Sequence, residues 1–153
     1  MTESYNIQIS TDKSLLDINV IFNFLSQSYW AKGRSVSLIK KSIENSLCFG
    51  VYTNKKQIGF ARVVTDYATF AYLADVFILE GERGKGFARK LIETIMRFPE
   101  LKNVRRWMLA TKDAHNLYSQ FGFHKLKNPE RFMEIVLPAG IDSSGRSDTL
   151  NTD

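Results

Sequence analysis

Hydrophobic residues follow two spacings along this chain, one typical of helices and one typical of strands. Apolar residues recur every three or four positions in three segments, which predicts amphipathic helices over residues 14–25, 35–43 and 87–96. Alternating or continuous apolar runs, bounded by polar turns, predict strands over residues 5–9, 47–52, 57–65, 69–79 and 104–111. This mixture of elements is typical of an α/β domain.

Capping and terminating residues indicate where the helices begin and end. We expect Ser14 and Ser35 to cap the first two helices, because a serine side chain can accept a hydrogen bond from an N–H group of the first turn. Pro99 is expected to end the third helix, since proline cannot continue one. Asp113 is expected to cap a short fourth helix that ends at Gly122.

The end of the chain divides into an apolar part and a polar part. Two further apolar runs, at residues 123–126 and 131–136, predict the final strands of the domain. Residues 139–153 are rich in Ser, Gly and Asp, so we expect a disordered polar tail. The sequence therefore predicts one α/β domain over residues 1–138, with helices flanking a mixed sheet.

Composition and charge narrow the class of protein. The chain has 153 residues, one cysteine (Cys48), no apolar run of membrane-spanning length and no apolar leader, so we expect a cytoplasmic protein without a membrane partner. The net charge is +5, and the tail carries −2, which leaves +7 on the domain. Such a basic domain suits a polyanionic partner: nucleic acid, an acidic membrane surface or a phosphorylated cofactor.

The most informative segment is the strand–loop–helix sequence at residues 75–92. Its loop holds Gly84 and Gly86 among basic residues, and the following helix directs unpaired N–H groups toward the loop. Glycines let a ligand approach the backbone closely. A pyrophosphate site is one interpretation, and a tight turn with solvated basic side chains is the other.

Known phosphate-binding and RNA-binding motifs do not fit this loop. Phe87 stands where a P-loop requires lysine, and Arg89 stands where a dinucleotide-binding fingerprint requires its third glycine. Lys85 to Ala88 match the first half of an RNA-recognition motif, but the continuation fails and Phe87 lies on the helical apolar stripe. We therefore expect no nucleic-acid partner.

The loop instead resembles that of the GNAT superfamily of N-acetyltransferases. The acetyl-CoA loop of that family reads Q/R-x-x-G-x-G/A, which Arg83, Gly86 and Ala88 satisfy. A second block, residues 113–123, is similar to the family's A-x-x-L-Y-x-x-x-G-F segment, and the residues in register are Ala114, Leu117, Tyr118, Gly122 and Phe123. Thr111 departs from the asparagine of many members, and this change affects an expected cofactor contact.

The resemblance implies a fold and a cosubstrate. It implies a sheet whose long central strand carries a bulge and splays from its neighbour, with acetyl-CoA bound in the opening. The pantetheine arm would pair with the strand, and the pyrophosphate would lie on the loop. The implied cofactor-binding residues are Val76, Phe77, Ile78, Arg83, Gly84, Lys85, Gly86, Phe87, Ala88 and Arg89.

The resemblance also implies catalytic roles. Tyr118 matches the family's general-acid tyrosine, which protonates the departing thiolate. Asp75 lies within an apolar strand, where a carboxylate needs either hydrogen bonds or a function, so it is the expected base or a residue that satisfies the bulge. Asp66 is the weaker candidate, because turns favour aspartate for local reasons.

The acceptor pocket is expected at the loop between the first two helices, where Tyr29, Trp30 and Arg34 lie. Bulky side chains favour a pocket for a small-molecule amine, and Arg34 or Arg62 could bind an anionic group on it, unless both are solvated surface charges. Trp107 either joins this pocket or belongs to the core.

Two residue types suggest no additional chemistry. His115 and His124 lack further ligands at zinc spacing, so no metal is expected. Cys48 is expected to be a buried apolar residue, which favours direct acetyl transfer over a covalent enzyme intermediate.

Two functions remain open at this point. The first is an acetyl-CoA-dependent N-acetyltransferase that acts on a small primary amine, as a monomer or a homodimer. The alternative is a non-catalytic module that binds CoA or a protein, or an acetyltransferase of protein amines.

Overall fold

The computed structural model describes residues 6–138, which form an open five-stranded sheet with the order β1-β2-β3-β4-β5. Neighbouring strands are antiparallel except for β4 and β5, which are parallel. The strands are β1 (Gln8–Ser10), β2 (Leu47–Thr53), β3 (Lys56–Thr65), β4 (Phe70–Ile78) and β5 (Arg106–Leu109).

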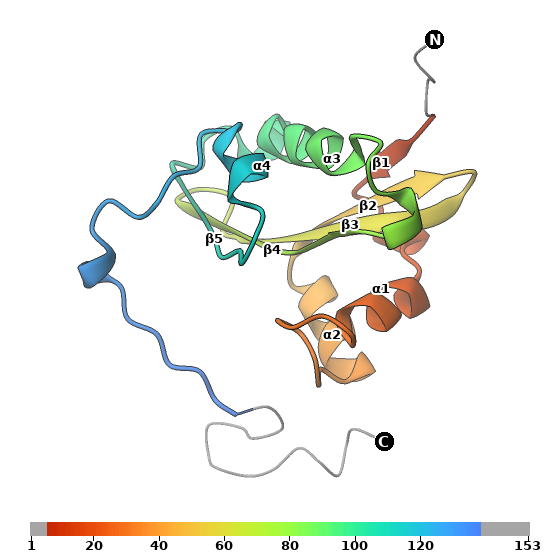
Figure 1. The fold of residues 1–153 in the computed structure, drawn as a ribbon, viewed down its shortest axis with the longest axis horizontal. Helices are drawn as coiled ribbons and strands as arrows, with labels where there is room; N and C mark the ends of the chain where they lie inside the picture. The colour runs from red at the N-terminus through yellow and green to blue at the C-terminus, as the bar shows by residue number, and fades with distance from the viewer. Residues whose placement is uncertain (1–5, 139–153) are drawn as a thin grey trace.

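Helices cover both faces of the sheet. Figure 1 shows α1 and α2 on one face and α3 and α4 on the other. Each face has its own buried apolar cluster, and Phe60 and Phe77 of the sheet pack with α1 and α2 while Leu91 and Ile95 of α3 pack on the opposite side. The α-helices of the described residues are α1 (Ile18–Leu25), α2 (Val36–Glu44), α3 (Phe87–Met96) and α4 (His115–Ser119).

The predicted α/β architecture is confirmed, and most helix ends agree with the sequence. Ser35 caps α2, because its hydroxyl oxygen accepts a hydrogen bond from the Leu38 N–H group at 3.1 Å. The expected cap of the first helix is wrong: Asp17 caps α1, while Ser14 lies in a preceding 3-10 turn. The chain bends between Ser14 and α1, so the apolar spacing there belongs to two elements.

The expected cap of the fourth helix is also wrong. The hydroxyl oxygen of Thr111 accepts the Ala114 N–H hydrogen bond at 3.0 Å, and Ala114 precedes the first residue of α4. Asp113 is exposed and is not the residue that caps the helix. Gly122 follows the helix with a φ of +97°, a conformation that glycine adopts without strain.

The two final strands predicted at residues 123–126 and 131–136 are absent from the described structure. Beyond Gly122 the chain first lies beside β5, where Phe123 packs against the core, and after the 3-10 turn at Pro129–Arg131 it runs away from the sheet (Figure 1). Residues 123–127 lie beside β5 without forming a ladder with it, and residues 131–136 pair with no strand of the described residues. None of the helices in residues 6–138 has the length and apolar character needed to cross a bilayer.

Two irregularities of β4 open a site. Between the Phe60–Phe77 pair and the Arg62–Ala74 pair, β4 has two residues where β3 has one, which places a bulge at Asp75 and Val76. The pairing of β4 with β5 ends at Leu73 and Leu109, although β4 continues to Ile78. The last part of β4 therefore has no strand on its β5 side, as the resemblance implied.

Candidate active site

A cleft of about 900 Å³ lies where β4 and β5 separate. Its walls come from β4, the residues that follow β5, the N-terminal end of α3, α4, and the loop between α1 and α2. Among the lining residues are Tyr29, Trp30, Arg34, Arg62, Asp75, Val76, Phe77, Ile78, Arg83, Ala88, Thr111 and Tyr118. The structure thus brings together residues from four separate segments of the sequence: 29–34, Arg62, 75–88 and 111–118.

The glycine loop forms one end of the site. Gly84 and Gly86 have φ values of +80° and +82°, and space around both is open: a Cβ atom built at either position has no neighbour within 4 Å. Gly86 is the residue before α3, and no side chain caps that helix end. An exposed backbone at the positive end of a helix suits an anion, so this loop fits the pyrophosphate of CoA.

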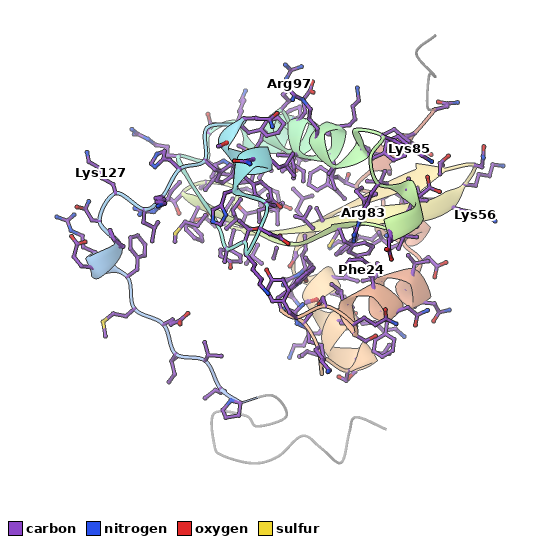
Figure 2. The ribbon with its side chains drawn as sticks, in the orientation of Figure 1. Phe24, Lys56, Arg83, Lys85, Arg97 and Lys127 are labelled. Atoms are coloured by element: carbon purple, nitrogen blue, oxygen red, sulfur yellow. The ribbon has the colours of Figure 1, made fainter. Side chains whose placement is uncertain are left out.

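The basic side chains of the loop hold its shape. The Arg83 side chain donates a hydrogen bond to the Ile78 carbonyl oxygen at 3.0 Å, which ties the loop to the end of β4. Lys85 pairs with Glu82 at 3.0 Å. Both side chains project from the segment between β4 and α3 (Figure 2). Arg83 is therefore a structural link as well as a residue of the cleft wall.

Two other residues of the expected cofactor set have structural partners. The guanidinium of Arg89 on α3 donates a hydrogen bond to the side-chain oxygen of Gln120 beyond α4. Phe87 is buried in the apolar cluster between α3 and the sheet. Phe87 can therefore offer a ligand its backbone but not its ring.

The bulged end of β4 offers backbone more than side chains. Phe77 and Ile78 are buried, and the Phe77 ring stacks on the Phe24 ring of α1 with 4.1 Å between centroids. Val76 is half-buried. Since β5 has ended at Leu109, the peptide groups of residues 76–78 border the cleft without a neighbouring strand on that side. An extended ligand could form hydrogen bonds with them as an added strand would.

Tyr118 lies in the cleft wall on α4. It is only 8% exposed, its ring packs edge-to-face on Phe123 at 5.9 Å, and its hydroxyl has no hydrogen-bond partner among the described residues. Burial, with a smaller effect of the nearby Tyr29, raises the pKa of Tyr118 to about 12. The hydroxyl therefore keeps its proton at neutral pH and is available as a donor.

Asp75 is the centre of a buried polar cluster at the other end of the cleft. Its carboxylate accepts hydrogen bonds from Trp30 Nε1 at 2.9 Å and from Arg34 at 2.9 and 3.0 Å. It also accepts one from Arg62 Nε at 2.9 Å. The Asp75 side chain is 1% exposed, whereas those of Arg34 and Arg62 are 26% and 14% exposed. The carboxylate is enclosed, and the two cations border it.

The backbone explains this arrangement. Asp75 has a φ of +54°, which is uncommon for any residue except glycine, although aspartate tolerates it better than most. The bulge turns this side chain to the α1–α2 face, where Trp30 and Arg34 lie on one loop. Burial alone would raise the pKa of Asp75, but the bonds and charges of Arg62, Arg34 and Trp30 outweigh it and hold the pKa below its usual range.

These surroundings favour a structural role for Asp75 over a role as the base, and both were expected from the sequence. A general base must accept a proton, and a carboxylate with a lowered pKa and four hydrogen bonds is a weak acceptor. The alternative expectation was an aspartate that accepts hydrogen bonds from donors around the bulge. Asp75 does accept such bonds, but its donors are side chains rather than backbone N–H groups.

The expected acceptor residues lie together over the cleft. Besides its bond to Asp75, Trp30 contacts the Tyr29 ring edge-to-face at 5.2 Å. The Tyr29 hydroxyl oxygen accepts a hydrogen bond from the Lys112 N–H group at 3.1 Å, and the Lys112 ammonium lies 5.5 Å from the Tyr29 ring centre. These contacts join the α1–α2 loop to the segment before α4, so the loop roofs the cleft.

The sequence analysis did not connect Arg62 with Asp75, although a signal was present. Both charges interrupt apolar strands, and residues 66–68 form the turn between those strands. Antiparallel pairing about that turn places Arg62 opposite Ala74, next to Asp75. Two opposite charges on neighbouring antiparallel strands were that signal, but the register and the bulge decide their pairing, because Arg62 lies three residues before the end of β3 and Asp75 five residues after the start of β4.

The remaining candidate residues do not line the cleft. Asp66 accepts hydrogen bonds from three backbone N–H groups and the hydroxyl of its own turn, so its role is local. Trp107 packs against the core and does not line the cleft. Cys48 is 1% exposed, as expected of an apolar core residue, and burial raises the pKa of its thiol to about 11. No cluster of three metal-ligating side chains occurs within residues 6–138.

Comparison with known proteins decides the family. The model of the acetyltransferase (GNAT) family matches residues 17–123, which span the glycine loop, the bulged strand and Tyr118. The chain belongs to the GNAT acetyltransferase family. Family members transfer acyl groups, and this match confirms the resemblance found in the sequence.

Relatives of this GNAT protein agree with that assignment. It is 31% identical over 136 residues to the Gibberella zeae protein named "Putative acetyltransferase FG08082", with 73% of this chain and 75% of that protein covered. A GNAT-family crystal structure from Xanthomonas campestris pv. campestris is 46% identical, with a TM-score of 0.85 over 88% of this chain and 95% of that one.

A more distant neighbour carries a ligand. A "predicted acetyltransferase" from Clostridium acetobutylicum, solved with acetyl-CoA, has a TM-score of 0.61 and 12% identity, covering 86% of this chain and 95% of that one. At that identity the likeness concerns the fold.

Proposed function

We propose that this GNAT protein transfers an acetyl group from acetyl-CoA to the primary amine of a small molecule. One observation carries the proposal. A single cleft joins the bulged end of β4, the end of α3 that bears the glycine loop, the Tyr118 hydroxyl and the Arg34–Asp75–Arg62 cluster. The proposal rests on this continuity, because the reaction needs both substrates within reach of one proton donor.

The cofactor half of the cleft fits acetyl-CoA, which supplies an acetyl group activated as a thioester. The loop backbone at residues 84–89 would hold the pyrophosphate, and the unpaired side of residues 76–78 would hold the pantetheine arm as an added strand. Arg83 fixes the glycine loop relative to the end of β4, because its side chain donates a hydrogen bond to the Ile78 carbonyl oxygen.

Tyr118 would act on the departing sulfur. A hydroxyl with a pKa of about 12 is protonated at neutral pH, and it has no partner among the described residues that would compete for its proton. As the amine nitrogen bonds to the acetyl carbon and the carbon–sulfur bond breaks, the amine loses one proton and the sulfur gains one. Tyr118 is placed to donate to that sulfur.

The acceptor half of the cleft favours a small amine that also carries an anionic group. Asp75 balances one of the two arginine charges, so the cluster has one positive charge in excess. Arg34 binds Asp75 through one terminal nitrogen only, which leaves its second terminal nitrogen able to donate to a ligand. The aromatic roof formed by Tyr29 and Trp30 limits the size of the acceptor.

Asp75 is assigned as a positioning residue. It holds Arg34, Arg62 and Trp30 in one arrangement, and its ionised state maintains the charge pattern that an anionic acceptor would meet. Cys48 is buried outside the cleft with a raised pKa, so direct attack by the amine within a ternary complex is the proposed route. Two-substrate kinetics would then give intersecting lines.

The experiment is an assay of CoA thiol release with acetyl-CoA and a panel of amines, followed by Tyr118→Phe. This change removes one hydroxyl and should lower kcat by ~10²-fold, while CoA affinity by calorimetry stays nearly constant. Tyr52→Phe is the matched control, because Tyr52 is also buried, has a pKa raised to about 12 by burial and has an unpaired hydroxyl away from the cleft.

Each part of the proposal has an outcome that contradicts it. Equal kcat values for wild type and Tyr118→Phe, with chemistry rate-limiting, would remove Tyr118 from the mechanism. CoA binding without turnover of any amine would favour the non-catalytic module. Faster turnover of peptide amines than of every small amine would reassign the acceptor to a protein.

A further inference from the structure

The cleft is bordered by an amine that belongs to the protein itself. Lys112, in the segment between β5 and α4, is the only lysine among the described residues that line the cleft. Its ammonium lies 5.5 Å from the centre of the Tyr29 ring, a geometry in which the face of an aromatic ring attracts a cation. No carboxylate within residues 6–138 forms an ion pair with this ammonium. The amine is therefore held at the cleft by a contact that it can leave without stranding a buried charge.

The backbone places this amine on the same side of the cleft as the proposed proton donor. The Lys112 N–H group donates a hydrogen bond to the Tyr29 hydroxyl oxygen at 3.1 Å, so the base of the side chain is fixed. Tyr29 in turn lies near Tyr118, close enough to influence its pKa, and both rings line the cleft. The four-carbon stem of a lysine rotates freely, so the amine of Lys112 can swing from the Tyr29 ring toward Tyr118.

Other lysines of the described residues lack these surroundings. Lys32 is exposed on the loop between α1 and α2, but it does not line the cleft. Lys56 begins β3, at the far end of the sheet from α4 (Figure 2). Lys85 borders the glycine loop, and its ammonium pairs with Glu82 at 3.0 Å. Position in the fold, rather than the chemistry of the amine, therefore distinguishes Lys112.

We propose that Lys112 is a self-acetylation site, whose side-chain amine attacks the thioester of acetyl-CoA bound in the cleft of the same chain. This inference rests on the acetyl-CoA binding of the proposed function. The ammonium first loses a proton to solvent, and the neutral nitrogen then bonds to the acetyl carbon while the carbon–sulfur bond breaks. The nitrogen loses a second proton, and the sulfur gains one from Tyr118, which regains its own from water. The products are acetyl-lysine and the CoA thiol.

This modification would change the charge of the cleft. Acetylation converts the Lys112 ammonium into a neutral amide, which removes one positive charge and ends the attraction of the cation to the Tyr29 ring. The contact of Tyr29 with the segment before α4 would then depend on the hydrogen bond from the Lys112 N–H group. Self-acetylation would therefore lower the positive charge that an anionic acceptor meets at the cleft and weaken the roof above it.

The first test is the rate of acetylation at individual lysines. The full chain is incubated with acetyl-CoA and no other amine, and peptide mapping by mass spectrometry follows Lys112, Lys32 and Lys56 over time. Lys112 should be acetylated ~10²-fold faster than the other two, because a positioned proton donor contributes ~10²- to 10⁴-fold. Acetyl phosphate, a donor without the CoA group, is the matched control and should modify the three lysines at similar rates.

The second test asks whether the reaction occurs in the cleft and within one chain. Excess CoA fills the cofactor site without supplying an acetyl group, so it should suppress acetylation of Lys112 and leave that of Lys32 unchanged. Dilution of the protein at constant acetyl-CoA should leave the first-order rate at Lys112 unchanged. Lys112→Arg keeps the positive charge but lacks the reactive amine, so the fast phase should disappear from the mass of the intact protein.

The outcomes separate this inference from the proposed function. Equal rates at Lys112 and Lys32, or no protection by CoA, would overturn self-acetylation, and calorimetry and thiol release with small amines would still report the proposed reaction. A rate that rises with protein concentration would also overturn it, because a second molecule would then be the enzyme. Fast acetylation of Lys112 without turnover of any small amine would support this site and contradict the proposed acceptor. Absence of CoA binding would overturn both.

Discussion

The two halves of the cleft are built from different parts of the polypeptide. In the cofactor half, a ligand would meet backbone groups: glycines with positive φ at 84 and 86 and the unpaired side of β4. In the acceptor half, a ligand would meet charged and aromatic side chains organised around Asp75. The first half depends on local conformation, whereas the second depends on contacts between distant segments.

This difference has a physical basis. A backbone site needs a permissive sequence of about six residues and a helix that begins in the right place, so it is encoded locally. The acceptor cluster joins Arg34, Arg62 and Asp75, which are 13 to 41 positions apart. Each of these charges would be costly to bury by itself, so the cluster is stable only when the whole sheet and the α1–α2 loop are assembled.

The largest expected effect tests the acceptor half as a structural unit. Asp75→Ala leaves two partly buried guanidinium groups without their carboxylate and should lower the free energy of unfolding by about 3 kcal/mol, the low end for a broken buried pair. Chemical denaturation measures this effect. Asp75→Asn keeps the shape and should cost less, so equal losses for the two variants would show that charge is not what Asp75 contributes.

The same comparison has a pH dependence. The pKa of Asp75 is lowered in the folded protein, so its stabilising contribution is complete above the unfolded value of about 3.9 and is lost as pH falls toward the lowered folded value. The free energy of unfolding should therefore fall more for wild type than for Asp75→Asn as the pH is lowered from neutral to below the folded pKa of Asp75. Parallel curves for the two proteins would contradict the assignment.

The second effect tests the cofactor half. Gly86→Asp puts a side chain and a negative charge where the loop offers open backbone at a φ of +82°, and it should weaken CoA binding by ~10²-fold. Gly81→Asp is the control, because it adds the same charge to the same loop at a glycine with open space and no positive φ. Calorimetry with CoA distinguishes the two, and equal affinities would move the pyrophosphate site elsewhere.

The smallest expected effect tests whether the acceptor half of the cleft acts independently of the cofactor half. Arg34→Ala should raise KM for a carboxylate-bearing amine by ~10–100-fold, the equivalent of a lost charged hydrogen bond of ~1.5–3 kcal/mol. KM for acetyl-CoA should stay nearly constant. Steady-state kinetics with the same amine lacking its carboxylate provides the control, since a similar KM increase for both amines would mean that Arg34 shapes the pocket without binding an anion.

The sequence alone determined the elements whose residues are neighbours in the chain. The α/β architecture, the cap at Ser35 and the glycine loop followed from apolar spacing, one capping serine and a six-residue motif. The caps expected at Ser14 and Asp113 were wrong by a few residues. At the first helix, a bend separates Ser14 from α1, so Asp17 caps the helix instead. At the fourth helix, the Thr111 hydroxyl accepts the hydrogen bond of the Ala114 N–H group.

Only the tertiary structure decided how distant residues were used. The bulge at Asp75 is not visible in the apolar pattern of β4, yet it turns the carboxylate toward the Trp30 side chain. The apolar run at 131–136 is typical of a strand, but a strand also requires a partner, and beyond Phe132, which contacts Arg106, the chain leads away from the edge of β5. Local pattern specifies what a segment can form, and the edges and charges that surround it decide what it does form.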